Sequence, residues 1–485
     1  MRQCLIYMMI VAILGACSAP GIPDATDTGS LPEIYPDYIG VTVPPNLAPV
    51  RFRAADKKFD DMRALFAGSE KSVMVGQTDG MIAISPAQWA DIATPGDSVN
   101  VTLYTLRDGR WSRYRPFALH VSNDMIDPYI AYRKIEPGYE TWNEMGIYQR
   151  CLENFEESAI LTNRSTGYGC INCHSFCNGS PDTMLLHMRV NNAGTYVAKN
   201  GDVERLDTST PHTISALVYP AWHPGGRYAA FSTNTTTQMF HTSDPDRIEV
   251  MDHASDVVVY DTESREILTC PLTGSAASFE TFPAFSPDGR TLYFCTADSM
   301  PIPEAYDSVR YNICSVAFDA ATRRFGERVD TLVNAAAMGK SASFPRVSPD
   351  GRYLMFVLSD YGNFSIWHRE ADLYMADLHT GRLWPLDAIN SDETESYHSW
   401  SSNGRWVVFA SRRLDGLYTR PFIAHIDATG RASKPMLVPQ ADIDHYNIEM
   451  KSYNVPEFVR GKMETPHKGL SKATRTEAVK VKAIR

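Results

Sequence analysis

The sequence has little cysteine and no excess of basic charge. Nine cysteines occur among 485 residues, and 46 Lys and Arg stand against 57 Asp and Glu, which gives a formal net charge of -11. Nucleic-acid binding needs concentrated Lys and Arg against phosphate, so this balance argues against a nucleic-acid partner. The chain is otherwise 44% hydrophobic and 21% charged. It is long enough for two or three domains with substantial cores.

The apolar run at the N-terminus is too short to cross a bilayer with its polar flanks. Residues 1–17 read MRQCLIYMMIVAILGAC, an apolar stretch that ends in small residues and a cysteine. This pattern predicts a secretory signal. The ending Leu14-Gly15-Ala16-Cys17 resembles the bacterial lipobox, which implies a lipoprotein lipidated at Cys17; an ordinary cleaved signal is the alternative. We therefore expect a periplasmic chain anchored to a membrane, the outer one, through residues 18–45 as a flexible tether rich in Pro, Gly, Ser, Thr and Asp.

Four similar segments repeat in the second half of the chain. They are YPAWHPGGRYAAFSTN from Tyr219, FPAFSPDGRTLYFCTA from Phe282, FPRVSPDGRYLMFVLS from Phe344 and YHSWSSNGRWVVFASR from Tyr397. In each, a short strand leads to a Gly-Arg turn and an alternating strand, and the Gly-Gly, Asp-Gly and Asn-Gly pairs favour tight hairpins. A second hairpin follows each segment, so each unit predicts a four-stranded sheet. Such sheets bury both faces by stacking around an axis, as the blades of a β-propeller do.

These segments resemble the WD-like repeats of the TolB family over residues 215–440, which implies a propeller fold. A weaker fifth unit is expected at 183–208, and strands from before the cysteine cluster could complete a sixth. Residues 46–135 show period-two alternation with Gly-bearing turns, which indicates a small β-sandwich-like domain. We therefore predict an all-β chain whose propeller of five to six blades spans 183–445.

The C-terminal segment, residues 446–485, is expected to be a basic tail. Residues 460–485 hold eight Lys or Arg against Glu464 and Glu477. Such a charge run is typical of a solvated disordered tail, with contact to anionic lipid or cell-wall polymer as the alternative.

A cluster of cysteines lies in the expected linker, residues 136–182. The stretch TGYGCINCHSFC, residues 166–177, contains Cys170 and Cys173 followed by His174. This is the C-x-x-C-H spacing at which two thiols add to the vinyl groups of haem and the histidine binds the iron. We therefore predict a loop that holds haem c through both thiols, with His174 as the proximal ligand. A zinc or iron-sulfur site, a thioredoxin-like dithiol and plain disulfides stay open as alternatives.

A sixth iron ligand is sought in the strand that follows the motif. His187 is the favoured distal ligand, Met184 or Met188 is the alternative, and a vacant position is the third case. Met184 and Met188 share one face of an alternating strand and His187 points to the other. Cys151 and Cys177 are expected to form a disulfide that braces the haem loop.

Two classes of function follow from these features. The first is a membrane-anchored monohaem c-type cytochrome that exchanges electrons with a redox partner protein or senses redox state. The second is a TolB-like binding or scaffold lipoprotein that recognises an envelope protein or polymer. A propeller enzyme is a weaker third, because no Gly-x-Ser-x-Gly segment occurs and the remaining histidines lack metal-ligand spacing. The whole chain resembles haem-motif TolB-like lipoproteins of the Bacteroidetes type, and this resemblance implies no settled role.

Overall fold

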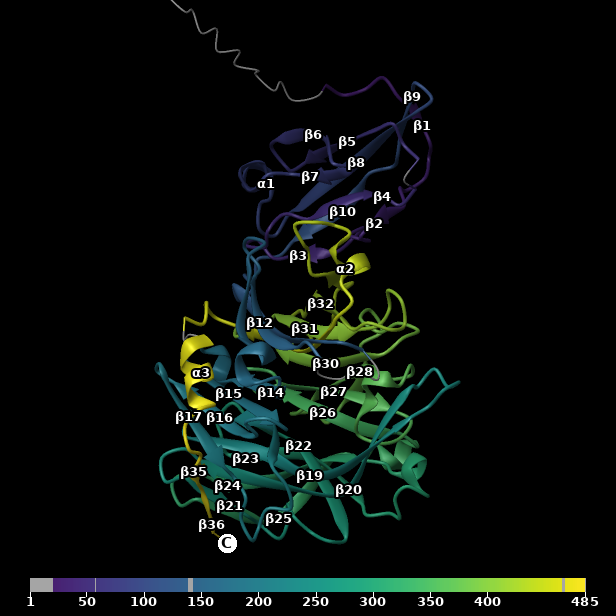
Figure 1. The fold of residues 1–485 in the computed structure, drawn as a ribbon. Coiled ribbons are helices and arrows are strands. Elements are labelled where there is room, and N and C mark those ends of the chain that lie inside the picture. The colour runs from purple at the N-terminus through teal and green to yellow at the C-terminus, as the bar shows by residue number, and fades with distance from the viewer. Residues whose placement is uncertain (1–20, 57, 138–142, 465–466, 485) are drawn as a thin grey trace, which may run out of the picture.

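The computed structural model describes residues 21–56, 58–137, 143–464 and 467–484. A small N-terminal domain stands on a large propeller (Figure 1). The two parts pack against each other: the Trp406 indole donates to the Asp124 carbonyl at 3.0 Å, and the Tyr38 hydroxyl donates to the Leu437 carbonyl at 3.2 Å. Buried apolar side chains continue from the N-terminal domain into the third to fifth blades of the propeller.

The N-terminal domain is built on a curved ten-stranded sheet, whereas a β-sandwich-like domain was predicted for residues 46–135, of which Tyr129–Ile135 belongs to the propeller. Among its described residues it has one helix, α1 (Pro86–Ile92), which begins with a capping box in which Ser85 and Gln88 bond reciprocally and which buries Trp89. The strands are β1 (Thr26–Asp27), β2 (Ile34–Tyr35), β3 (Thr42–Val43), β4 (Arg51–Ala54), β5 (Asp61–Ala67), β6 (Ser72–Thr78), β7 (Met81–Ala83), β8 (Ser98–Arg107), β9 (Arg110–Arg113) and β10 (Phe117–Val121).

Six sheets form the blades, which confirms the β-propeller. Blade 1 is β14 (Cys170–Phe176), β15 (Thr183–Arg189), β16 (Gly194–Lys199) and β17 (Asp202–Asp207). Blade 2 is β18 (Leu217–Trp222), β19 (Tyr228–Phe240), β20 (Ile248–Asp261) and β21 (Glu266–Leu268). Blade 3 is β22 (Ser278–Phe285), β23 (Thr291–Asp298), β24 (Asn312–Asp319) and β25 (Arg324–Val333). Blade 4 is β26 (Ser341–Val347), β27 (Tyr353–Ser359), β28 (Asp372–Asp377) and β29 (Leu383–Pro385). Blade 5 is β30 (Glu395–Trp400), β31 (Trp406–Ser411), β32 (Arg420–His425) and β33 (Met436–Leu437).

Blade 6 closes the ring with strands from two distant parts of the chain. Its inner strand is β34 (Ser452–Val459), and the outer three are β11 (Tyr129–Ile135), β12 (Gly146–Cys151) and β13 (Glu157–Thr162). β34 pairs antiparallel with β11. The backbone hydrogen bonds of this pair join a segment near residue 130 to one near residue 455. Strand pairing therefore closes the ring of blades.

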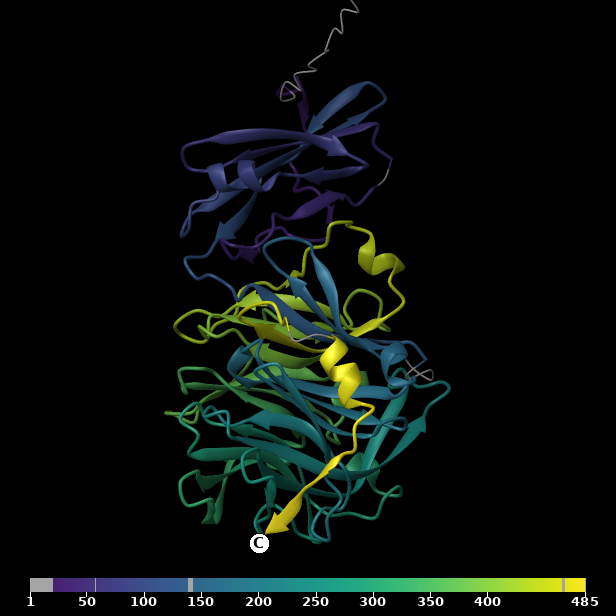
Figure 2. The same ribbon diagram turned by 60° about the vertical axis from the view of Figure 1, so that its left-hand side comes forward.

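Several expected boundaries differ from the structure. The predicted tether, 18–45, supplies β1 to β3 of the N-terminal domain and buries Tyr38 and Val41. The predicted linker, 136–182, holds strands of blades 6 and 1. The predicted tail, 446–485, holds β34 and then α3 (His467–Ala473), β35 (Val479–Lys480) and β36 (Lys482–Ile484). Figure 2 shows this C-terminal segment running down the outside of the propeller, where β35 and β36 pair in parallel with blades 1 and 2.

Candidate functional site

The inner strand of every blade carries a bulge at the same place. A residue with positive φ interrupts the pairing register each time, and such values are uncommon for residues other than glycine. The six residues are Cys173, Tyr219, Phe282, Phe344, Tyr397 and Val455, with φ between 44° and 53°. Each is followed by proline or, in blades 1 and 5, by histidine. The cysteine motif is therefore the inner strand of blade 1, and Cys173-His174 is its bulge, so the predicted haem loop is a strand.

Four of the bulge residues form an aromatic layer across the propeller axis. Their ring centroids lie 4.5 Å apart between Tyr219 and Phe282, 4.2 Å between Phe282 and Phe344, and 4.7 Å between Phe344 and Tyr397. Inner-strand residues that precede the bulge line one cavity, and residues that follow it line another. The aromatic layer thus separates two axial cavities.

The first, which we call the arginine cavity, has a volume of about 410 Å³ and is bordered by Arg133, Arg189 and Arg412. None of these three arginines forms an ion pair with any residue that the structure describes. Glu136 also borders the cavity, but it is paired with Lys451. The cavity therefore holds an excess of positive charge in a chain whose net charge is negative.

The two inner arginines are fixed by their surroundings. The Arg412 guanidinium lies 3.3 Å from the centre of the Trp367 ring, and its Nε donates to the Ile366 carbonyl at 2.7 Å. Burial lowers the pKa of Arg412 to about 9. Arg133 donates to the Asn172 side chain, and its Nε is buried without a hydrogen bond among the described residues. A buried donor without a partner costs free energy, so an acceptor in the cavity would stabilise this group.

The second, which we call the histidine cavity, has a volume of about 500 Å³ and is bordered by His174, His398, Arg346 and Glu457. His398 Nε2 lies 3.0 Å from the Met355 carbonyl. His398 Nδ1 and His174 Nε2 are buried and have no hydrogen-bond partner within the described residues. Burial lowers the pKa of each imidazole to about 3, so both rings are neutral and each offers a free nitrogen.

Glu457 is one of two acidic residues that border the histidine cavity, and the other is Asp127. Both carboxyl oxygens of Glu457 lie 3.1 Å from the Phe176 amide nitrogen, which donates to them. Burial raises the pKa of Glu457 to about 8, against the opposing effects of this amide and of Arg346. At neutral pH the group is therefore largely a neutral carboxylic acid, which can donate a proton.

The three groups of the predicted haem motif do not share one face. Cys170 borders the arginine cavity, His174 borders the histidine cavity, and Cys173 lies in the bulge between them. Both thiols are 8% exposed. A single macrocycle must reach both thiols and the imidazole, so the residues as placed here do not fit an attached haem. Haem attachment stays a prediction, and its test is a Soret band that survives denaturation.

The residues proposed for the sixth ligand lie inside blade 1. Met184 and Met188 are fully buried in its apolar core. His187 is 2% exposed, and burial lowers its pKa to about 3. None of the three borders either axial cavity.

The predicted disulfide is wrong in this structure. Cys151, in β12 of blade 6, and Cys177, after β14 of blade 1, are both free thiols. Strand pairing places them in different sheets, which the sequence positions alone could not show. The predicted lipidation site, Cys17, lies outside the described residues.

Comparisons with known proteins give a likeness of fold. No protein-family profile matches the sequence, and no curated protein matches it. Among solved structures, a puromycin hydrolase is 13% identical with a TM-score of 0.35, over 65% of this chain and 52% of that chain. The periplasmic gluconolactonase of Pseudomonas aeruginosa is 14% identical with a TM-score of 0.37, over 68% and 99%. A puromycin-hydrolyzing peptidase of Mycobacterium tuberculosis is 14% identical with a TM-score of 0.36, over 82% and 57%. The match thus spans only about half of each puromycin-hydrolysing protein.

The predicted function, an electron-transfer or redox-sensing cytochrome, is wrong. The placement of Cys170 and His174 on different cavities supplies the physical reason.

Proposed function

We propose that the propeller binds a small amphipathic anion in the arginine cavity. The observation that carries this proposal is that Arg133, Arg189 and Arg412 converge there without a carboxylate partner among the described residues. A guanidinium presents a fork of donors that matches a carboxylate or phosphate group. Such an anion would supply the acceptor that the buried Nε of Arg133 lacks.

The rest of the cavity wall suits an apolar part of the same ligand. Aromatic and aliphatic side chains border the arginines, namely Val218, Tyr219, Ile248, Val250, Phe364, Ile366, Trp367 and Tyr397. A volume of about 410 Å³ is in the range of small-molecule sites. An aromatic or aliphatic acid, or a phosphate ester with an apolar group, has this combination of properties.

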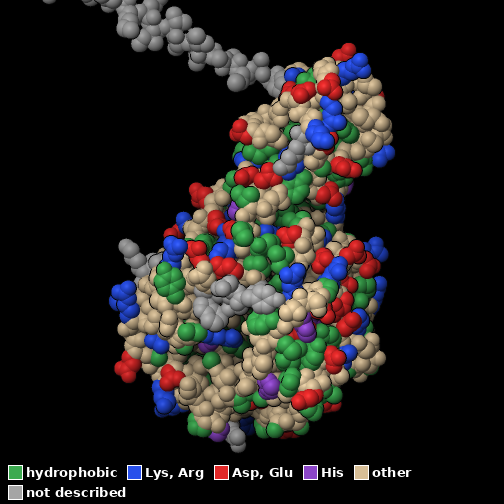
Figure 3. Space-filling view, turned by 45° about the vertical axis from the view of Figure 1, so that its right-hand side comes forward, with side chains coloured by type: hydrophobic (Ala, Val, Ile, Leu, Met, Phe, Trp, Pro, Cys, Tyr) green, Lys and Arg blue, Asp and Glu red, His purple; other side chains and the backbone are tan. Residues whose placement is uncertain are grey.

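The positive charge belongs to the cavity rather than to a broad basic surface. On the face in Figure 3, acidic and basic side chains are interspersed. A macromolecular polyanion would need a continuous basic surface, so a small anion fits this distribution better.

The test uses a fluorescent amphipathic anion, 1-anilinonaphthalene-8-sulfonate, with phenyl phosphate and benzoate as competitors. The Arg189 side chain is exposed and makes no hydrogen bond with the described part of the chain, so Arg189→Gln removes charge without disturbing packing. We expect this variant to weaken binding about 10-fold, in line with the loss of one charge-assisted contact. Arg290→Gln, which neutralises an exposed arginine on a turn outside the cavity, is the matched control. Equal affinity of all three proteins, or affinity that rises with salt, would contradict the proposal.

Acid-base catalysis in the histidine cavity is the second candidate function. Its supporting observation is the neutral carboxyl of Glu457 beside two neutral imidazoles with free nitrogens. Groups poised in this way can transfer protons during ester, lactone or peptide hydrolysis. The test is hydrolysis of a panel of esters, lactones and peptides by the native chain and by Glu457→Gln. A hydrolysis rate unchanged by Glu457→Gln would remove this candidate.

We further propose that the chain is exported and anchored in the periplasm through Cys17. The sequence of residues 1–17 supports this, as does its resemblance to a TolB-like lipoprotein. Within the described residues, no helix has the length and apolar character needed to span a bilayer. Radiolabelled palmitate incorporated by the native chain and lost in Cys17→Ser is the expected result. Equal labelling of the two would contradict it.

A further inference from the structure

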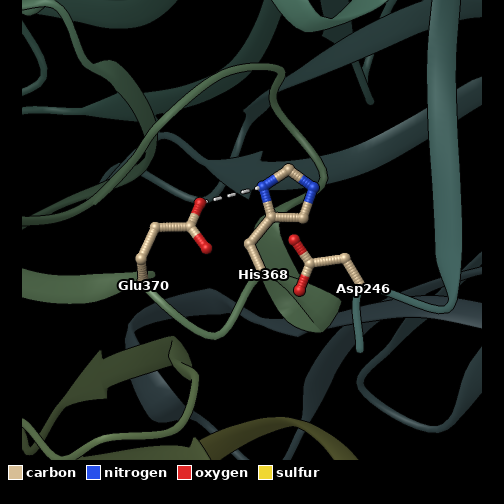
Figure 4. Close-up of side chains that lie close together, drawn as sticks. All are labelled: Asp246, His368 and Glu370. Atoms are coloured by element: carbon tan, nitrogen blue, oxygen red, sulfur yellow. Dashed lines mark ion pairs between the residues drawn. The ribbon is translucent and has the colours of Figure 1, made fainter. Parts of the chain in front are cut away.

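Two loops from different blades bring a histidine and two carboxylates together. Asp246 lies in the turn between β19 and β20 of blade 2, and His368 and Glu370 lie in the connection between β27 and β28 of blade 4 (Figure 4). One ligand atom of each residue lies within 4.8 Å of the other two. No sequence motif predicts this group, because more than 100 residues separate Asp246 from His368.

The two nitrogens of the His368 imidazole differ in their contacts: Nε2 has a hydrogen-bond partner, whereas Nδ1 faces Glu370 at ion-pair distance. Nε2 lies 3.2 Å from Glu249 Oε2, and the Tyr361 hydroxyl donates to the other oxygen of Glu249 at 2.6 Å. Nδ1 lies 3.5 Å from Glu370 Oε1 and forms no hydrogen bond with any described residue. The side chain is 1% exposed, so bulk solvent does not reach this nitrogen.

The group also carries more negative than positive charge. Three carboxylates, Asp246, Glu249 and Glu370, lie beside the His368 imidazole, and a second imidazole, that of His241, lies 3.9 Å from Glu249 Oε1. Neither Lys nor Arg forms an ion pair with these carboxylates among the residues described. Even with both imidazoles protonated, one negative charge would remain in excess. Partial burial of carboxylates without a cation costs free energy, so a bound cation would stabilise this group of side chains.

We propose that Asp246, His368 and Glu370 form a binding site for a divalent transition-metal ion of the Zn²⁺ or Mn²⁺ type. His368 Nδ1 and one oxygen from each carboxylate are the ligands, and water completes the coordination. Glu249 accepts from Nε2–H and fixes the ring, which is the usual arrangement for a metal-bound histidine. An imidazole with two carboxylates suits these ions, whose ligands lie about 2.0–2.2 Å from the metal, so binding would draw the three donors together from separations of up to 4.8 Å.

A bound metal ion would link a loop of blade 2 to a loop of blade 4 beside the arginine cavity. Ile248 follows Asp246, Ile366 and Trp367 precede His368, and all three border that cavity. The metal site does not depend on the anion proposed above, since its ligands are not among the residues that border the cavity. Occupancy should therefore raise the unfolding temperature of the propeller even when no anion is present.

The experiment titrates the EDTA-treated chain with ZnCl₂ and, separately, MnCl₂ by calorimetry. We expect one site per chain, weakened at least 10-fold by Asp246→Asn and by Glu370→Gln. Glu304→Gln, which alters an exposed carboxylate outside the group, is the matched control and should bind as the native chain does. X-ray absorption of the zinc-loaded chain should show nitrogen and oxygen ligands only.

Three results would overturn the proposal. They are the absence of stoichiometric binding of either ion, affinity unchanged in both variants, and sulfur in the zinc coordination sphere. Circular dichroism of the variants separates loss of the site from loss of the fold.

Discussion

The carboxyl group of Glu457 makes the stability of the propeller depend on pH. Its pKa lies near 8 in the folded chain, against an ordinary value of 4.5, because burial disfavours the charged form. A raised pKa means that the folded state holds a proton which the unfolded state releases. The associated stability is fully present below pH 4.5 and is lost as the pH rises through about 8.

The size of the effect follows from the two pKa values. They differ by about 3.5, and each unit corresponds to about 1.4 kcal/mol, so ionisation costs about 5 kcal/mol at most. Glu457 borders the histidine cavity and is only partly buried, so solvent reduces this figure. We expect Glu457→Gln to keep the amide contact from Phe176 and to remove the pH-dependent loss.

The assay is urea denaturation of the native chain and of Glu457→Gln at pH 5, 6, 7, 8 and 9. The native chain should lose stability relative to the variant with each step up to pH 8, by at most about 1.4 kcal/mol per pH unit. Glu304→Gln, at an exposed position, should follow the native profile. Parallel profiles for the native chain and Glu457→Gln would refute the reasoning, because they would show that the carboxyl ionises normally.

Three further predictions concern the propeller scaffold. Phe344→Ala leaves a gap in the aromatic layer and should lower the free energy of unfolding, measured by urea denaturation, by about 3–5 kcal/mol. Met338→Ala, at an exposed position, should change that free energy little. Equal losses in the two variants would contradict the packing role of Phe344. Removal of residues 479–485 deletes β35 and β36 and should leave a propeller that circular dichroism shows to be folded. Removal from residue 451 onward also deletes β34 and should unfold the propeller. A folded product of the longer deletion would argue against ring closure by β34. Cys151 and Cys177 should both react with iodoacetamide in denaturant without reductant, and a mass spectrum that shows the two linked would restore the predicted disulfide.

The propeller could be predicted because its signals are local. Each Gly-Arg turn, as at Gly226 and Gly289, lies within a dozen residues of the strands that it joins, and hairpin pairing follows from that proximity. The ends of the chain were mispredicted for the opposite reason. Segments 18–45 and 446–485 look polar or basic, yet each contains strands, because the partner strands lie far away in the sequence. Composition does not report a partner that is distant in sequence.

The candidate sites show the same limit. The C-x-x-C-H spacing predicted one chemical unit, but Cys170 precedes and His174 follows the bulge at Cys173, and this position along the strand assigns them to different cavities. No spacing in the sequence relates Arg133 to Arg412. Their convergence arises only when the blades close around the axis.

The all-β class, the repeating blades and the turns between their strands can be read from the sequence, because each of these depends on residues close together in the chain. The closure of the ring, the aromatic layer across the axis and the charged groups on either side of that layer are visible in the folded chain alone. Those features depend on contacts between blades, and the free energy of such contacts comes from burial and pairing that no local stretch contains.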